Sequence, residues 1–116
     1  MHIKIEKRYS AETKLEGEAN SFKEFIIANR SNLSGSDLRG SDLSDSYLRD
    51  SNLSDSDLRG SNLSDSNLRD SNLSDSDLRD SNLRGSDLRD SNLRGCRIKV
   101  IQKEDLLRSL GVIIED

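Results

Sequence analysis

The sequence predicts a solenoid, a rod in which short repeats stack on one another. Residues 31–95 consist of thirteen consecutive five-residue units with no insertion or deletion. Each unit begins with Ser and carries Leu at its centre, from Leu33 to Leu93. A period of five matches neither the roughly 3.6 residues of a helical turn nor the two-residue alternation of a strand. It suits a chain that turns a corner every five residues, so that every Leu points to a common axis.

The other places of the unit are also regular. The second place is Asn or Asp in twelve of the thirteen units, with Tyr47 as the exception. The fifth place is Gly or Asp, residue types that suit turns. A fourteenth, altered unit follows at 96–100, where Cys96 and Ile98 hold the places of Ser and Leu. A disordered Ser/Asp-rich tract is the alternative interpretation, but the unbroken phase of the repeat favours an ordered structure.

Residues 31–100 resemble the pentapeptide-repeat family, whose unit is commonly written A-(D/N)-L-x-x. Here Ser takes the first place instead of Ala, a change between two small residues. The resemblance implies an all-β solenoid, specifically a right-handed quadrilateral β-helix with four units per coil. Fourteen units would make about 3.5 coils. Residues twenty positions apart would then lie in one column on one face.

This stacking predicts the core and the surface columns. Asp37, Asp57 and Asp77 should run beside an Arg column on one face, and Arg49, Arg69 and Arg89 should form a second Arg column on the opposite face. The corner column of Asp50, Asp70 and Asp90 is the candidate interaction surface. The predicted structural core consists of Leu33, Leu38, Leu43, Leu48, Leu53, Leu58, Leu63, Leu68, Leu73, Leu78, Leu83, Leu88, Leu93 and Ile98.

The segment 1–30 is expected to cap the first coil, because an open β-helix exposes apolar side chains and unpaired backbone at its ends. Alternation over 2–8 and 14–19 predicts a β-hairpin, with Ser10–Thr13 between the strands. A capping-box pattern at 21–24 predicts the start of a short helix. The apolar face of this helix consists of Phe22, Phe25 and Ile26.

The segment 101–116 is expected to form a C-terminal cap made of a helix and a tail. A helix is predicted over 103–110, ending at Gly111, and followed by an apolar tail at 112–114. We expect this tail to cover the last coil of its own chain, so a monomer is favoured over a C-terminal homodimer. The inward face of the helix is predicted to consist of Leu106, Leu107 and Leu110.

The residues give little support for catalysis, and we expect no enzyme activity and no cofactor. His2 is the only histidine, and it lies in a predicted surface strand. Cys96 occupies an inward place and has no neighbouring His to activate it, so a packed thiol is favoured over a nucleophile. The Asp residues lack the spacing of an EF-hand loop, so no metal site is expected.

Composition limits the partners. The net charge is −4 and there are four aromatic side chains, which disfavours direct nucleic-acid binding. No apolar run is long enough to span a membrane, and no signal peptide is recognisable, so we expect a cytoplasmic protein that does not bind membranes. A protein partner of unknown identity is the remaining expectation.

Three functional hypotheses follow. The first is a non-enzymatic structural or protein-interaction module. The second comes from the resemblance, because some family members imitate duplex DNA and bind type II topoisomerases such as gyrase. Residues 31–95 carry eight Arg against thirteen Asp, so the negative charge of the repeats is too small for a good imitation of DNA. The third hypothesis is an artificial, regularised repeat scaffold, motivated by the near-identity of the units.

Overall fold

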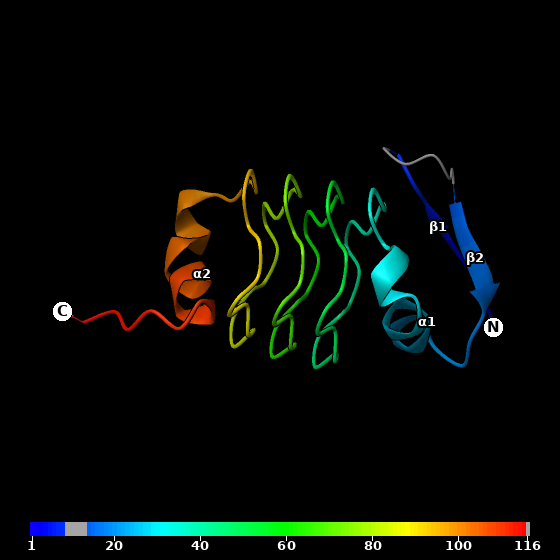
Figure 1. Ribbon diagram of the computed structural model, residues 1–116, viewed down its shortest axis with the longest axis horizontal. Coiled ribbons are helices and arrows are strands. Elements are labelled where there is room, and N and C mark those ends of the chain that lie inside the picture. Colours follow the sequence, from blue (N-terminus) through cyan, green and yellow to red (C-terminus); the bar gives the residue numbers. More distant parts are fainter. Residues whose placement is uncertain (9–13, 116) are drawn as a thin grey trace.

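A computed structural model of the chain describes residues 1–8 and 14–115. The molecule is a rod measuring 48 × 26 × 22 Å. Figure 1 shows a β-hairpin and helix α1 at one end, the stacked repeats in the middle, and helix α2 with the C-terminus at the other end. None of the helices in the described residues is long and apolar enough to cross a membrane.

The N-terminal end begins with an antiparallel hairpin of β1 (His2–Glu6) and β2 (Lys14–Glu18). The alternation of β1 buries Ile3 and Ile5 against the core and leaves their neighbours exposed. The predicted connection Ser10–Thr13 lies outside the described residues. The hairpin agrees with the sequence pattern, since period-two burial requires one apolar face.

Helix α1 (Phe22–Ala28) follows the hairpin. Its N-cap is Ser21, whose Oγ accepts a hydrogen bond of 3.1 Å from the N–H of Glu24. This bond satisfies one of the backbone donors that a helix leaves free in its first turn. Phe25 and Ile26 are buried in the same apolar cluster as the first repeats, and a 3₁₀ turn, η1 (Arg30–Asn32), leads into them.

The repeats form a right-handed β-helix solenoid. Parallel bridges join residues twenty positions apart, such as Asp37 with Asp57 and Asp57 with Asp77, so the chain returns to the same face after four units. The N–H groups of the central Leu residues from Leu38 to Leu78 donate to the next coil, as in the 2.8 Å bond from Leu58 to the carbonyl of Asp77. Each face contributes single bridges instead of long strands, because a corner follows every five residues.

Four faces can be named from this pairing. Face A comprises 31–35, 51–55, 71–75 and 91–95. Face B comprises 36–40, 56–60, 76–80 and 96–100. Face C comprises 41–45, 61–65 and 81–85, and face D comprises 46–50, 66–70 and 86–90.

The corners explain the choice of residue at the fifth place. All thirteen fifth-place residues from Gly35 to Gly95 have positive φ, including eight Asp residues. Gly adopts this left-handed region without a steric penalty, and Asp and Asn tolerate it better than other side chains. The alternation of Gly and Asp in the sequence therefore reflects one backbone conformation repeated at every corner.

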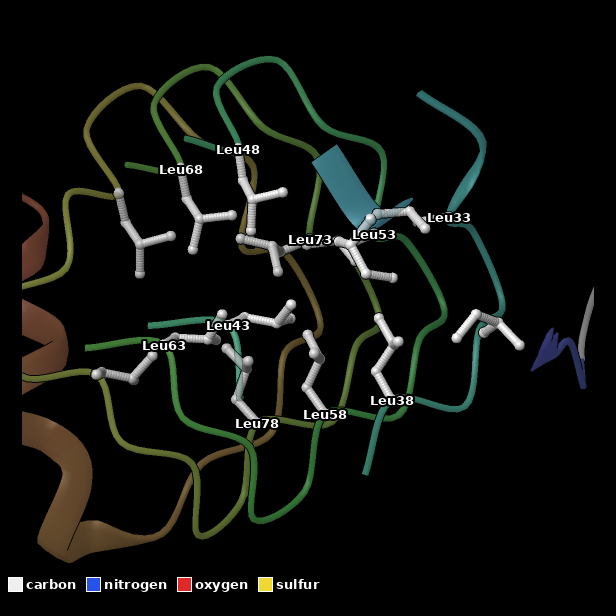
Figure 2. Packing of buried hydrophobic residues seen from close by; sticks show 14 of the residues in the cluster. Leu33, Leu38, Leu43, Leu48, Leu53, Leu58, Leu63, Leu68, Leu73 and Leu78 are labelled. Carbon is white, nitrogen blue, oxygen red and sulfur yellow. The ribbon is translucent and has the colours of Figure 1, made fainter. Parts of the chain in front are cut away.

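The Leu column fills the axis of the rod, as Figure 2 shows. The central Leu side chains from Leu33 to Leu88 are at most 2% exposed. Beside them most first-place Ser side chains turn inward and hydrogen-bond locally; the Oγ of Ser61, for example, donates to the carbonyl of Leu58 at 2.7 Å, whereas the buried Oγ of Ser36 has no partner among the described residues. Leu93 and Ile98 were expected in this core but are only half-buried, because no further coil covers them.

The C-terminal end differs in part from expectation. A 3₁₀ turn, η2 (Val100–Gln102), precedes helix α2 (Lys103–Ser109), which packs Leu106 and Leu110 against the core. Leu107 is not part of that apolar cluster. The tail does not cover the last coil: Figure 1 shows it running away from the stack, and Ile113 is 83% exposed. The expected packing of the tail is therefore wrong.

Candidate interaction surface

Face B carries a continuous network of ion pairs. Arg59 donates from Nε to Oδ1 of Asp57 at 2.9 Å and from Nη2 to Oδ2 at 2.6 Å. The same guanidinium lies 3.6 Å from the carboxylate of Asp77 in the next coil. Arg39 and Arg79 hold Asp37 and Asp77 with the same pair of bonds. The Asp and Arg columns predicted for this face thus neutralise each other within the molecule.

The arginines lower the pKa of the carboxyl groups beside them. Hydrogen bonding from Arg39, aided by its backbone N–H and by the charge of Arg8, lowers the pKa of Asp37 to about 2. Bonds from Arg59 and Arg79 likewise lower the pKa of Asp57 and that of Asp77. These hydrogen bonds favour the charged form more than the partial burial of each carboxyl group disfavours it. These lowered pKa values keep Asp37, Asp57 and Asp77 ionised at any ordinary pH.

Two cations at the ends of face B were not predicted to belong to it. Arg8, next to the hairpin, places its guanidinium 3.0 Å from Asp37 and 3.4 Å from Asp57. At the other end Arg97 occupies the next position of the Asp column and forms a parallel backbone β-bridge with Asp77. Both line a groove of about 500 Å³ whose wall alternates Asp and Arg. Face B is consequently more basic than the near-neutral face expected from its columns. The replacement of Asp by Arg at position 97 was the feature of the sequence that could have predicted this.

Face D has the same Arg column but fewer carboxylates to hold it. Arg89 pairs with Asp87 through two bonds, as on face B. Arg69 has Asn67 in the corresponding place, and its Nε is buried without a hydrogen-bond partner among the described residues. The different second-place residue therefore leaves this guanidinium without the intramolecular carboxylate that the others have.

Arg49 follows Tyr47 and reaches into the next coil instead. Its Nε and Nη2 lie 3.2 and 3.0 Å from Oδ2 of Asp70. Tyr47 itself is 54% exposed, the most exposed aromatic side chain in the described residues. Tyr47 was recognised in the sequence as an exception to the repeat, but not as part of a candidate surface.

The predicted column Asp50, Asp70 and Asp90 lies at the corner between faces D and A, where all three residues have positive φ. Each of the three is exposed. Asp70 is neutralised by Arg49, whereas Asp50 and Asp90 form no ion pair with any residue that the structure describes. The column is thus brought together as one strip, with a neutralised carboxylate between two free ones.

Faces A and C are lined by amide side chains that serve the backbone. Oδ1 of Asn52 accepts from the N–H of Ser54 at 3.2 Å and from its Oγ at 2.7 Å. Asp42 makes the same two bonds with Ser44. A second-place Asn or Asp therefore stabilises each turn into the corner, which accounts for its recurrence.

Among the residues that the structure describes, Cys96 and His2 lie apart, each with its own partners. The thiol of Cys96 donates to the carbonyl of Leu73 at 2.8 Å, and burial raises the pKa of this thiol, which disfavours the nucleophilic thiolate. His2 lies on the exposed side of β1, 2.9 Å from Glu18. Within the described ranges 1–8 and 14–115, no three His, Cys, Asp or Glu side chains gather to hold a metal ion.

The repeat geometry agrees with a comparison to protein families. A family profile described as "Pentapeptide repeat region" matches residues 26–102. The chain belongs to the pentapeptide repeat family. This match confirms the resemblance stated from the sequence, and it includes η1 and η2 on either side of the repeats. No curated protein sequence matches the chain.

Several solved pentapeptide repeat structures are similar to the chain. A pentapeptide repeat protein (Rfr23) from the cyanobacterium Cyanothece is 32% identical over 55% of this chain and 54% of that one, with a TM-score of 0.35. One from the thylakoid lumen of Arabidopsis thaliana is 29% identical over 54% and 47%, with a TM-score of 0.28. QnrB1, a plasmid-mediated fluoroquinolone resistance protein, is 20% identical over 72% and 44%, with a TM-score of 0.33. The chain spans about half the length of these structures.

Proposed function

We propose that this pentapeptide repeat protein is a non-enzymatic module that binds another protein through face D and its Asp corner. The observation that supports this proposal is the contrast between faces B and D. On face B Arg39, Arg59 and Arg79 are paired within the network, whereas face D carries Arg69 without a carboxylate partner among the described residues, the exposed ring of Tyr47 and the free carboxylates of Asp50 and Asp90. A partner protein can bury the Tyr47 ring and pair with the carboxylates of Asp50 and Asp90, contacts that the fold itself leaves unused.

The residue types support a protein partner. Tyr and Arg are enriched among the residues that dominate protein–protein binding energy. Arg69 and Tyr47 lie in adjacent coils of one face, so a single partner surface can contact both. Because the surrounding groups are charged, the contact should weaken with salt, as exposed charges are screened beyond about 8–10 Å at physiological ionic strength.

The same proposal assigns roles to the three segments. Residues 31–100 form the binding rod, a β-helix of about 3.5 coils by the four-unit pairing. Residues 1–30 and 101–116 act as caps that keep the ends of the rod from associating. The apolar contacts of Phe25 and Ile26 at one end, and of Leu106 and Leu110 at the other, support these roles.

Site-specific photocrosslinking tests the proposal. A benzophenone amino acid is placed at position 47 on face D or, as a matched control, at position 62, the second place of face C. We expect adducts with a discrete protein from position 47 only. The purified adduct partner should then bind Tyr47→Asn, which restores the repeat consensus, at least tenfold more weakly than the parent, while Asn62→Asp should bind normally. Equal crosslinking from both positions, or unchanged affinity of Tyr47→Asn, would contradict the use of face D.

Imitation of DNA is the second candidate, and the strip of Asp50, Asp70 and Asp90 is the observation in its favour. Three stacked carboxylates at one corner present a line of negative charge, but Arg49 neutralises the middle one. We therefore expect no strong inhibition of gyrase supercoiling at micromolar protein. Potent inhibition that disappeared when all three Asp residues were changed to Asn would place DNA mimicry first.

A further inference from the structure

The last coil leaves part of its backbone unpaired. In the coil before it, the N–H groups of Leu73 and Leu78 donate to the carbonyls of Asn92 and Arg97 at 2.8 and 2.9 Å. The corresponding N–H groups of Leu93 and Ile98 have no backbone acceptor among the described residues. Faces A and B therefore end in a row of free backbone groups over residues 91–98, which we name the open edge.

The corner between faces B and C, and face D, are closed at the same end by residues that follow the repeats. The side chain of Gln102 donates from Nε2 to the carbonyls of Leu78 and Ser81 at 2.7 and 2.9 Å. The carbonyl of Ser109 accepts from the N–H of Leu88 at 2.8 Å. The end of the rod is thus closed at one corner and along face D, whereas the N–H groups of Leu93 and Ile98 on the adjacent faces A and B stay without a backbone acceptor among the described residues.

The open edge also exposes apolar surface. Leu93, Cys96 and Ile98 pack against the core but are only half-buried, unlike the Leu residues of earlier coils. Next to them Val100 and Ile101 are 88% and 87% exposed. A strand laid on this edge would satisfy the backbone groups and complete the burial of the last core residues together.

The side chains along the open edge are basic. Arg97 stands where the column of face B would continue with Asp, so Arg79 finds a carboxylate in its own unit, Asp77, but not in the next coil. Arg94 on face A and Arg97 on face B form no ion pair with any described residue, whereas Lys99 is paired with Asp80 at 2.8 Å. Two free cations flank the edge, which complements an acidic strand.

We infer that the open edge binds an extended, acidic segment of a partner protein by β-strand addition. Main-chain hydrogen bonds from the free backbone groups supply affinity, and pockets for alternate side chains supply specificity. An apolar side chain over each of Leu93 and Ile98 completes the axis, and a carboxylate over Arg97 restores the alternation of charge seen between Arg59 and Asp77. This surface lies at the end of the rod and is independent of face D.

Amide hydrogen exchange measured by NMR tests the inference. The probe is a decapeptide with the sequence of residues 71–80, SNLSDSDLRD, which pairs with 91–100 from the opposite side in the folded chain. In the free protein the amides of Leu93 and Ile98 should exchange far faster than those of Leu73 and Leu78. Saturating peptide should slow Leu93 and Ile98 at least tenfold. A peptide in which both Leu residues are replaced by Ser should have no effect.

Matched variants separate this edge from the rest of the surface. Arg97→Asp restores the Asp column and should fold normally, yet it should bind the peptide at least tenfold more weakly. Arg84→Asp on face C and Tyr47→Asn on face D should bind it like the parent. The inference is overturned if Leu93 and Ile98 are already protected in the free monomer, if the peptide gives no protection, or if Arg97→Asp binds equally well. Protection that rises with protein concentration would overturn it in favour of self-pairing.

Discussion

Arg59 holds Asp57 with two parallel hydrogen bonds, whereas Arg69, in the equivalent place on the opposite face, has Asn67 and no carboxylate to hold. The two arginines are ten residues, or half a coil, apart and differ in the residue two positions before them. This difference makes them a matched pair for measuring what the internal ion pairs contribute to stability.

Arg59→Gln should weaken the pH dependence of stability, and Arg69→Gln should leave it nearly unchanged. A lowered carboxyl pKa in the folded state adds stability that is present above the ordinary value of 3.8 and is lost as pH falls through the folded value, about 2 for Asp37. Removing Arg59 abolishes the main cause of the shift at Asp57. The loss at pH 7 should be no more than about 1 kcal/mol, because the pair is partly exposed, and should vanish once the pH has fallen below the lowered pKa of Asp57.

Urea unfolding of the parent and both variants at several pH values between 2 and 7 provides the measurement. The unfolding free energy of the parent should rise with pH over the lower part of this range, and that of Arg59→Gln should rise less. If the two variants change the pH dependence of the unfolding free energy equally, the bond between Arg59 and Asp57 does not cause that dependence.

Leu63→Ala should destabilise the protein by roughly 2–5 kcal/mol, as for a truncated core Leu that leaves a cavity. Leu63 is fully buried in the middle of the column. Leu93→Ala removes the same atoms from the half-buried end and should cost clearly less, since solvent already reaches that site. Chemical denaturation of the two variants makes the comparison, and equal losses would show that the last coil is as well covered as the centre.

Gln102→Leu should cost roughly 2–4 kcal/mol, although it keeps the side chain close in size. Oε1 of Gln102 accepts from the N–H groups of Lys99 and Asp80 at 2.8 and 3.3 Å, and its Nε2 donates to two carbonyls. Buried backbone groups left without partners cost about 1–3 kcal/mol each. The neighbouring control Ile101→Ala, at an exposed position, should change stability by less than about 0.5 kcal/mol. A thermal melt of Gln102→Leu that matched this control would contradict the role of Gln102.

Deletion of 112–116 should leave the melting temperature and the monomer unchanged, because the described part of this tail is largely exposed. Deletion of 101–116 also removes Gln102 and the contacts of Leu106 and Leu110, and should lower the melting temperature and cause association. Light scattering coupled to size-exclusion chromatography distinguishes the two. A monomeric, equally stable 1–100 fragment would show that the C-terminal segment is not a cap.

Much of the rod is already determined by the sequence alone. The five-residue period, the central Leu and the small first-place Ser require a corner at every unit and an apolar axis, and these properties depend only on neighbours along the chain. The same holds for the Asp and Gly corners and for the hairpin and helix signals at the N-terminus. Stacking at twenty residues also places Asp50, Asp70 and Asp90 in one strip.

The tertiary structure alone decided which charges remain free and which ends are closed. Arg8 reaches Asp37 and Asp57 from outside the repeats, and Arg49 pairs with Asp70 in the next coil. Gln102 closes the corner between faces B and C, while the apolar tail, which was expected to cover the last coil, runs into solvent. Long side chains pair with the charges that lie within reach in space, and backbone groups at an edge hydrogen-bond to the residues that the rest of the fold places beside them. Neither choice is encoded in the period of the repeat.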